Sequence, residues 1–259
     1  YTVIIAGAFV SMAMLPYHHV AGENQRGLSV AAIKEGVHYV WTHQVILGSM
    51  TLDMFAVIFG GAKGLLPVYA KDILHVGGLG YGLLYASLDI GSFLMALVLV
   101  FRPPIYRTGK TLIYSVAVFG LLTMIFGLSR NVYLSVLVYM AIGMADEVSV
   151  VMRNVIIQLA TPDALRGRVS SVNQVFIQAS NQLGAMESGF LAAITSATFA
   201  VVSGGAAAIA VSGAIGLKMK ELFNYTTEAN AMAVAHAGGP PPMTKEVAEA
   251  EEEHVAASG

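Results

Sequence analysis

Residues 81–101 read YGLLYASLDIGSFLMALVLVF, a continuous apolar run in which Asp89 is the only charged side chain. A helix needs about 20 such residues to cross the hydrocarbon core of a bilayer. Because lipid offers no hydrogen-bond partner to an unpaired backbone, a run of this kind predicts a membrane-spanning α-helix. Its hydrophobic residues follow one another instead of alternating with polar ones, which argues against a transmembrane β-strand.

Similar apolar runs fill most of the chain on both sides of this stretch. Complete spans are predicted at residues 44–66, 81–101, 111–127, 132–155, 169–194 and 199–217. The connectors between them are short, and glycines that would let helices approach closely lie in or beside the runs. These are Gly60, Gly61, Gly64, Gly78, Gly80, Gly82, Gly204, Gly205, Gly213 and Gly216. The sequence therefore predicts an all-α, polytopic transmembrane bundle of six helices.

The composition excludes several classes of function. The chain is 56% hydrophobic and only 12% charged, against about 25% charged residues in an ordinary soluble domain. Its net charge of −2 and the lack of any Lys/Arg-rich tract argue against nucleic acid as a partner. There is no cysteine, and apart from the adjacent His18 and His19, which are typical of a polar loop, the histidines lack ligand spacing. We expect neither a metal site nor a cofactor.

The remaining segments divide the chain into four parts. Residues 1–16 form an apolar stretch without an initial Met or a cationic leader, which fits a partial transmembrane helix better than a signal peptide. Residues 17–43 form a polar connector, in which 29–40 could be a short surface helix. The six-span bundle occupies 44–217. Residues 218–259 contain a Gly/Pro run and an acidic run and are predicted to be a disordered tail.

Cationic residues predict the orientation of the bundle, because cytoplasmic loops carry an excess of Lys and Arg. One set of alternate connectors holds Arg26, Lys34, Arg102, Arg107, Lys110, Arg166, Arg168, Lys218 and Lys220. The other set holds Lys71 and Arg130. We therefore expect the first set of connectors, and the carboxyl terminus, to be cytoplasmic.

Several ionisable residues lie inside the predicted spans, where a charge near the helix centre costs about 2.5–3.5 kcal/mol on insertion scales. They are Asp53, Lys63, Asp89, Asp146, Glu147, Arg153 and Glu187. Each could belong to a coupling-ion or substrate site, or could make an interhelical hydrogen bond. Lys63 and Arg153 lie near predicted span ends, where a long side chain can reach the interface. We predict proton coupling or substrate charge at Glu187, Asp53, Asp89 and Asp146.

The span at 169–194 has the most polar residues, and at about 100° per residue they gather on one side of the helix. Gln174, Gln178, Asn181 and Ser188, with Ser170, share one arc, and Asn173, Ser180 and Glu187 form a neighbouring line. Apolar residues occupy the opposite arc. This pattern favours a helix that shows lipid one face and lines an aqueous cavity with the other, and it makes Glu187 our first choice for coupling. Packing through amide hydrogen bonds is the alternative.

Two ordered strings resemble the major facilitator family that contains the enterobactin exporter. The first combines RN at 153–154, TPDALRGRV at 161–169, SVN at 171–173, ASNQLG at 179–184 and ESG at 187–189. The second combines LDMFAV at 52–57, FGGA at 59–62 and LPVYA at 66–70, and it resembles the seventh helix of that family. The resemblance covers about 29–217. It implies two six-helix bundles with the substrate at their interface, of which this chain would hold the second and lack the amino-terminal one.

The loop YRTGK at 106–110 resembles the Asp-Arg-x-Gly-Arg signature of the superfamily without its Asp. Arg107, Gly109 and Lys110 carry this likeness, and Arg166 and Arg168 lie in the next connector of the same set. The loop could form a charge latch or could be an ordinary cationic loop on the cytoplasmic side.

These observations favour proton-coupled export of siderophore-like or drug-like small molecules across a bacterial inner membrane, by alternating access. An intramembrane serine protease is disfavoured, because Ser212-Gly213 lacks the flanking Gly of the usual nucleophile motif and no His lies in a complete span. We therefore do not expect an enzyme. The alternative is a non-transporting structural or regulatory membrane protein derived from a transporter half.

Overall fold

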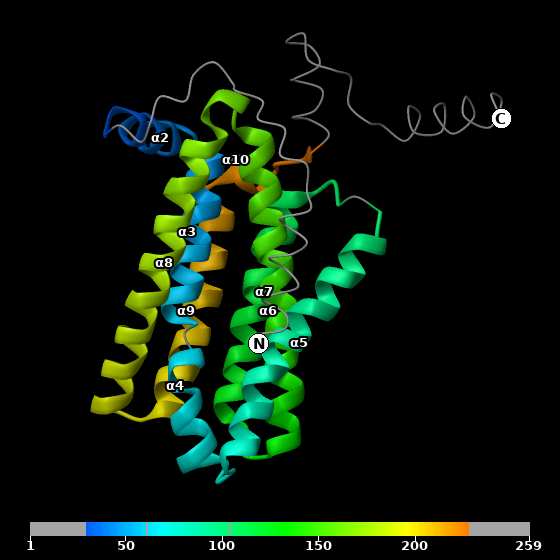
Figure 1. The fold of residues 1–259 in the computed structure, drawn as a ribbon, viewed down its shortest axis with the longest axis vertical. Coiled ribbons are helices and arrows are strands. Elements are labelled where there is room, and N and C mark those ends of the chain that lie inside the picture. Colours follow the sequence, from blue (N-terminus) through cyan, green and yellow to red (C-terminus); the bar gives the residue numbers. More distant parts are fainter. Residues whose placement is uncertain (1–29, 61, 104, 228–259) are drawn as a thin grey trace, which may run out of the picture.

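The computed structural model describes residues 30–60, 62–103 and 105–227, and this part of the chain is a bundle of helices with no strand (Figure 1). The partial helix predicted at 1–16, His18 and His19, and the acidic run of the tail lie outside the described residues. The helices are α2 (Val30–Thr42), α3 (Gln44–Phe59), α4 (Ala62–Val68), α5 (Gly78–Phe101), α6 (Thr108–Leu128), α7 (Val132–Ala160), α8 (Asp163–Ile194), α9 (Ala197–Lys218) and α10 (Lys220–Phe223). A π-helical turn, η1 (Tyr69–Ile73), follows α4.

The long helices run alongside one another, and their ends define the two ends of the bundle (Figure 1). The α10 end carries α2, α10 and the connecting residues 102–103, 105–107 and 161–162. The η1 end carries α4, η1 and the connectors at 74–77, 129–131 and 195–196. Side chains cap some of these turns. Asn131 accepts hydrogen bonds from the first backbone amides of α7, and Ser196 accepts one from Phe199 at the start of α9.

Five helical segments are long and apolar enough to cross a membrane: Gln44–Ile73, α5, α6, α7 and α9. The chain is therefore a multi-pass membrane protein. The predicted span at 169–194 lies within α8, which has 32 residues but is not among the five. Its glutamines, asparagines and serines lower its hydropathy, although it packs along α3 and α9 like the others. Large apolar side chains on the outer faces, such as Phe93, Phe101 and Phe190, are exposed and would meet lipid.

The first long span is interrupted near its middle, where the sequence predicted one helix over 44–66. α3 ends at Phe59 and α4 begins at Ala62, with Gly60 as the cap residue between them. Pro67 lies inside α4, and it cannot donate the backbone hydrogen bond that would reach the carbonyl of Lys63. The π-helical turn follows directly. Interruptions of this kind are common beside binding sites in transporters.

Glycines bring several helices to backbone contact. A side chain at Gly91 of α5 would overlap the carbonyl of Met140 in α7, and one at Gly143 of α7 would overlap that of Leu88 in α5. Among the glycines predicted for packing, Gly204 and Gly205 make such close approaches, whereas a side chain at Gly60 would overlap the ring of Phe119. Gly78, Gly82 and Gly213 have open space at the same position. The crossings of α5 with α7, and of α9 with α3 and α6, therefore depend on glycine.

The segment after α9 differs from the predicted tail, because residues 219–227 pack back onto the bundle. Leu222 is fully buried in a cluster with residues of α3, α6 and α7. The Gly109 amide donates a hydrogen bond to the Tyr225 carbonyl at 3.2 Å, and the Thr227 amide donates to the Tyr106 carbonyl at 2.9 Å. This segment and the loop before α6 therefore form one unit.

Candidate functional site

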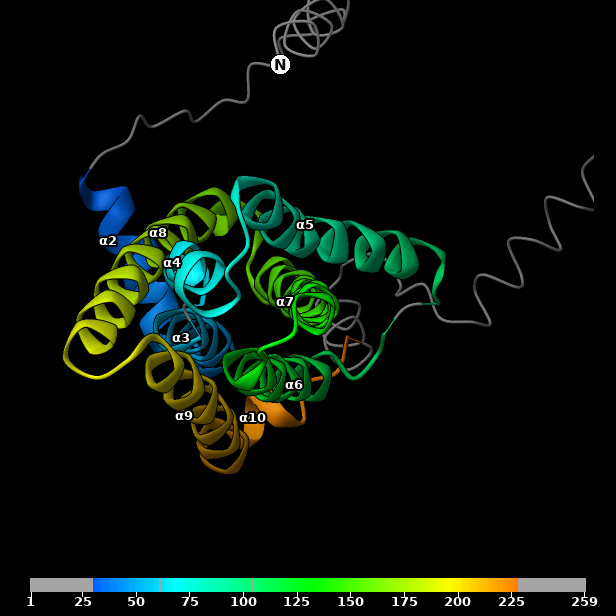
Figure 2. The ribbon, with the colours of Figure 1, turned by 90° about the horizontal axis from the view of Figure 1, so that it is seen from below.

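A cavity of about 540 Å³ lies between α3, α4, α5, α6, α7 and α8 and opens to the surface of the bundle. Figure 2 looks along the bundle and shows α4 between α8 and α7, with α5 beside α7. The cavity is lined by Val57, Gly60, Lys63, Gly64, Tyr85, Leu88, Phe119, Tyr139, Ile142, Asp146, Gln178, Asn181, Gly184 and Ala185. A few polar groups on otherwise apolar walls are typical of small-molecule sites, and this volume lies in their usual range.

Asp146 is the central residue of the 29-residue helix α7 and faces this cavity. Within the described part of the chain, its carboxylate makes no hydrogen bond and no ion pair. The charged side chains that interact with it electrostatically are Glu147, the next residue of α7, and Lys63, which also lines the cavity. The Lys63 ammonium lies 5.2 Å from the ring centroid of Tyr85, over the ring face. A carboxylate with no fixed partner is therefore available to a ligand or a proton.

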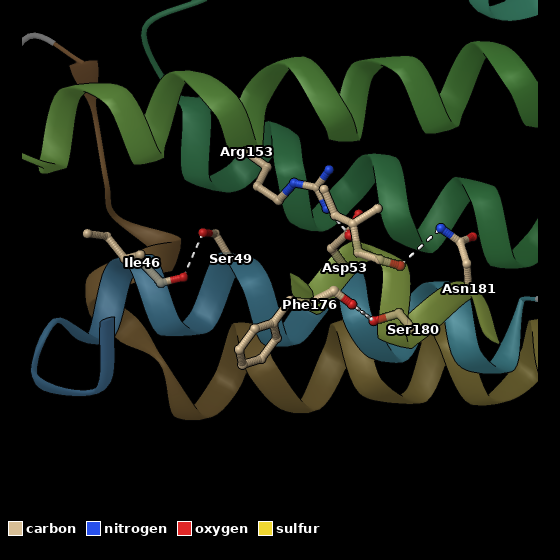
Figure 3. Close-up of polar contacts among 8 residues, drawn as sticks. Ile46, Ser49, Asp53, Arg153, Phe176, Ser180 and Asn181 are labelled. Carbon is tan, nitrogen blue, oxygen red and sulfur yellow. Dashed lines mark hydrogen bonds and ion pairs between the residues drawn. The ribbon is translucent and has the colours of Figure 1, made fainter. Parts of the chain in front are cut away.

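Two amide side chains of α8 complete the polar wall. Gln178 and Asn181 both line the cavity, and the Asn181 amide nitrogen donates to the Ile177 carbonyl at 3.0 Å (Figure 3). That bond leaves the Asn181 side-chain oxygen as an acceptor. Gln178 also borders a shallow depression on the surface of α8, together with Gln174 and Gln182. The three glutamines therefore lie on an exposed side of α8, next to the cavity.

The neighbouring line of polar residues on α8 lies elsewhere. Asn173 and Ser180 of this line are buried and do not line the main cavity, and Ser188, which the sequence placed on the arc of the glutamines, is buried with them. The Ser180 hydroxyl donates to the Phe176 carbonyl at 2.6 Å (Figure 3). Beside them, Gly184 sits close to the backbone of α3 at Val57. α8 therefore has three faces, because a packed arc separates the amide face from the lipid-facing arc.

The other predicted carboxylates are outside the cavity wall. Glu187 is half-buried on α8, with a carboxylate oxygen 3.5 Å from the Ser188 hydroxyl. Asp89 is exposed on α5, one helical turn beyond Tyr85. Asp53 is buried in α3 and paired with Arg153 of α7 (Figure 3).

The pair of Asp53 and Arg153 is one of the most buried polar contacts of the bundle, with side chains 8% and 4% exposed. The sequence placed Arg153 near a span end, where it could reach the interface. That expectation was wrong because α7 continues to Ala160, so Arg153 lies inside the helix. The contact joins α3 to α7 and neutralises both charges, so Asp53 has a partner that Asp146 lacks.

Comparison with known families decides what kind of protein carries this cavity. A family model described as transmembrane secretion effector, one of the major facilitator families, matches residues 7–253. The chain belongs to this family. No curated protein and no solved structure matches it. Membership makes the chain a membrane transporter, for which a central cavity with polar walls is the expected place for a small-molecule substrate.

In this transporter, the loop that resembles the superfamily signature has a structural role at the α10 end. Gly109 is buried where the carbonyl of Leu222 leaves no room for a side chain. The Lys110 ammonium lies 4.9 Å from the ring centroid of Phe223, and Arg107 is exposed at the start of α6. The loop's partner is therefore the segment after α9.

The arginines of the next connector are engaged locally. Arg166 pairs with Asp163 at 2.7 Å and donates to the Gln158 carbonyl at 3.2 Å. Arg168 pairs with Glu35 and so fixes α2 against the first turns of α8. These contacts hold the surface helix to the bundle.

Three polar residues of the cavity wall were not predicted as site residues: Lys63, Tyr85 and Tyr139. Lys63 was placed at a span end, but the helical segment continues to Ile73, and the lysine, although exposed, lines the cavity. Tyr85 precedes Asp89 by one helical turn, a spacing that puts both on one face of α5 and that could have revealed it. Tyr139 resembles any aromatic residue of a predicted span, and no feature of the sequence distinguishes it from the aromatic residues that only pack in the core.

Proposed function

We propose that this transporter is a secondary active exporter of small molecules, in which Asp146 carries the proton that is exchanged for substrate. The observation that carries the proposal is the geometry of that carboxylate. It stands at the middle of a membrane-spanning helix, lines the central cavity, and has no partner among the described residues. Ionisable groups kept inside a membrane without a partner typically belong to ion or substrate pathways.

The other three carboxylates predicted from the sequence are less suited to this role. Asp53 is held by Arg153. Asp89 and Glu187 do not line the cavity, although both lie on helices that do. Glu187, our first choice from the sequence, therefore becomes the comparison residue for the test.

We further propose that the chain forms the second six-helix half of a major facilitator fold, in which α8 also crosses the membrane and brings the number of spans to six. The polar faces of α5 and α8 border the cavity and would meet an amino-terminal bundle, which alternating access requires. The α10 end gathers the cationic connectors and is the cytoplasmic end in this proposal. The resemblance to the enterobactin exporter supports a bacterial inner membrane and siderophore-like or drug-like substrates.

The test is proton-coupled transport by the full-length protein in liposomes. An internal pH-sensitive dye reports proton movement when a lipophilic cationic dye or a catecholate siderophore is supplied. Either substrate should drive a saturable proton flux. Asp146→Asn should lower it at least about tenfold, because the amide keeps the shape but cannot ionise. Glu187→Gln should retain it.

The control is Asp163→Asn, which removes a carboxylate of the exposed pair with Arg166. It should transport like the wild type. Wild-type coupling in Asp146→Asn would contradict the assignment of the proton to this residue. Absence of flux for both substrates in the wild type would contradict transport of either class and favour a non-transporting membrane protein.

A further inference from the structure

The first described helix, α2, lies across the bundle instead of along it. Figure 1 shows α2 crosswise to the long helices at the α10 end, and Figure 2 shows that it crosses α8 and extends beyond the ring of long helices. A side chain at Gly36 would lie 3.1 Å from the Arg168 Cβ, so the two helices are close at this point. The Tyr39 hydroxyl donates to the Ala160 carbonyl at 2.8 Å. These contacts give α2 a fixed place on the outside of α8.

This place lies at one end of a surface that would meet lipid. Val40 of α2 packs in a buried cluster with Val169 and Val172 of α8. Further along α8, Met186 and Phe190 are exposed. Phe190 is about 31 Å from Val169 along the helix axis, at about 1.5 Å per residue, and the hydrocarbon core of a bilayer is about 30 Å thick. We therefore expect α2 at the level where hydrocarbon gives way to lipid headgroups.

On its outer face, α2 carries a stripe of three exposed side chains, Lys34, His38 and Trp41. Spacings of four and three residues put them on one face of the helix, roughly opposite its buried residues. Trp41 is 64% exposed. Among the described residues, none of the three side chains makes a hydrogen bond or an ion pair, whereas the carboxylate of Glu35 is paired with Arg168. The bundle therefore leaves this stripe uncovered.

We propose that the stripe docks on the phosphate layer of the surrounding phospholipids, so that α2 is an interfacial anchor of the bundle. Tryptophan is typical of this layer, because its ring is apolar and its N–H group needs a polar partner. Lys34 on the same face carries the charge that attracts lipid phosphates, and this attraction grows with the content of anionic lipid. The proposal does not depend on what the protein transports.

The experiment uses the emission of Trp41, which is the single tryptophan of the chain. The full-length protein is reconstituted in phosphatidylcholine vesicles whose acyl chains carry bromine, a contact quencher of tryptophan, either near the headgroup or near the chain end. The Trp41 signal is the difference between the wild type and Trp41→Phe. We expect stronger quenching by bromine near the headgroup.

A matched control reports a deeper position. Val118 is the central residue of α6 and is exposed on the bundle. Val118→Trp, made in Trp41→Phe, should show the reverse order, with stronger quenching by bromine near the chain end. The same order in both proteins would mean that the quenching does not report depth at Trp41, and the docking of α2 would then be refuted.

The role of Lys34 is tested in vesicles that also contain anionic phosphatidylglycerol. Lys34→Glu should lower the quenching of Trp41 by bromine near the headgroup at least about twofold, because the anionic surface then repels the stripe. Lys34→Arg should retain it. Lys218→Glu makes the same change of charge at an exposed position of α9 and should leave the quenching unchanged. Equal losses in Lys34→Glu and Lys218→Glu would refute a specific contact of Lys34.

Acrylamide, a quencher dissolved in water, separates the remaining outcomes. Quenching of Trp41 by acrylamide without quenching by either brominated lipid would mean that the stripe faces the aqueous phase, and would overturn the proposal. Protection from all three quenchers would mean that protein covers the stripe, such as the amino-terminal bundle of the proposed fold, and would overturn it equally. No transport is measured, so either result leaves the proposed export function as it stands.

Discussion

Breaking the buried ion pair between α3 and α7 should destabilise the bundle more than removing any exposed charge. The Arg153 and Asp53 side chains are 4% and 8% exposed. In Asp53→Asn, the guanidinium keeps its charge in a buried position but loses its compensating carboxylate. In Arg153→Gln, the Asp53 carboxylate keeps its charge in a buried position but loses the guanidinium that compensates it. Either change therefore leaves an uncompensated charge, which is the costly step.

The expected magnitude follows from burial. Removing one partner of a buried pair costs about 3–5 kcal/mol, and a domain of this size loses about 2–4 °C of melting temperature for each kcal/mol. The melting temperature of either single variant should thus fall by roughly 6–20 °C. The double variant Asp53→Asn/Arg153→Gln carries no buried charge, so it should recover much of that loss through non-additivity.

The measurement is thermal unfolding of the purified protein in detergent, followed by intrinsic fluorescence. The exposed pair of Asp163 and Arg166, with side chains 86% and 53% exposed, supplies the control. Asp163→Asn should change stability by less than about 1 kcal/mol. The reasoning is refuted if both single variants melt with the wild type, or if the double variant loses the sum of the two single losses.

Two further predictions concern packing and orientation. Gly91→Val should lower the free energy of unfolding by about 1–3 kcal/mol, because the new side chain would meet the Met140 carbonyl. Gly213→Val, where a side chain has open space, should leave the melting temperature unchanged. Equal losses in the two variants would contradict the role of glycine in the contact between α5 and α7. A reporter joined after Thr227, which keeps the packed segment 219–227 intact, should be active only in the cytoplasm, and activity on the opposite side would reverse the orientation of every connector.

The helices could be predicted from the sequence because apolar runs between short connectors have few alternatives in a membrane. The same reasoning placed Gln178 and Asn181 on a polar face of α8, and both line the cavity. It could not separate Asn173 and Ser180 from that face. Residues on adjacent arcs of a helix differ only in which neighbour covers them, and that depends on how α8 packs against α3.

Which buried charged residues are paired also could not be predicted from the sequence of single segments, because the partners come from different helices. Asp53 and Asp146 both lie in apolar surroundings in the sequence, and the adjacent Glu147 does not tell which of the two carboxylates is paired. They differ because Arg153 reaches Asp53 across the contact between α3 and α7. Lys63 was misplaced for a local reason, since the predicted span stopped at residue 66 whereas the helical segment continues through Pro67 to Ile73.

The shallow burial of α5 has a consequence for the adaptability of the cavity. Only 17% of its most apolar window is buried inside the bundle, against 39% for α7 and 50% for Gln44–Ile73. Apart from its close contact with α7 at Gly91, α5 has few buried side chains, and parts of a helix with few buried contacts move at a lower free energy than the helices around it. Tyr85 therefore lies on the compliant wall, whereas Asp146 lies on a wall braced by the ion pair of α3 and α7. Ligands of different widths could be accommodated by a small outward tilt of α5 while the charged anchor stays fixed, so selectivity would reside in charge more than in shape.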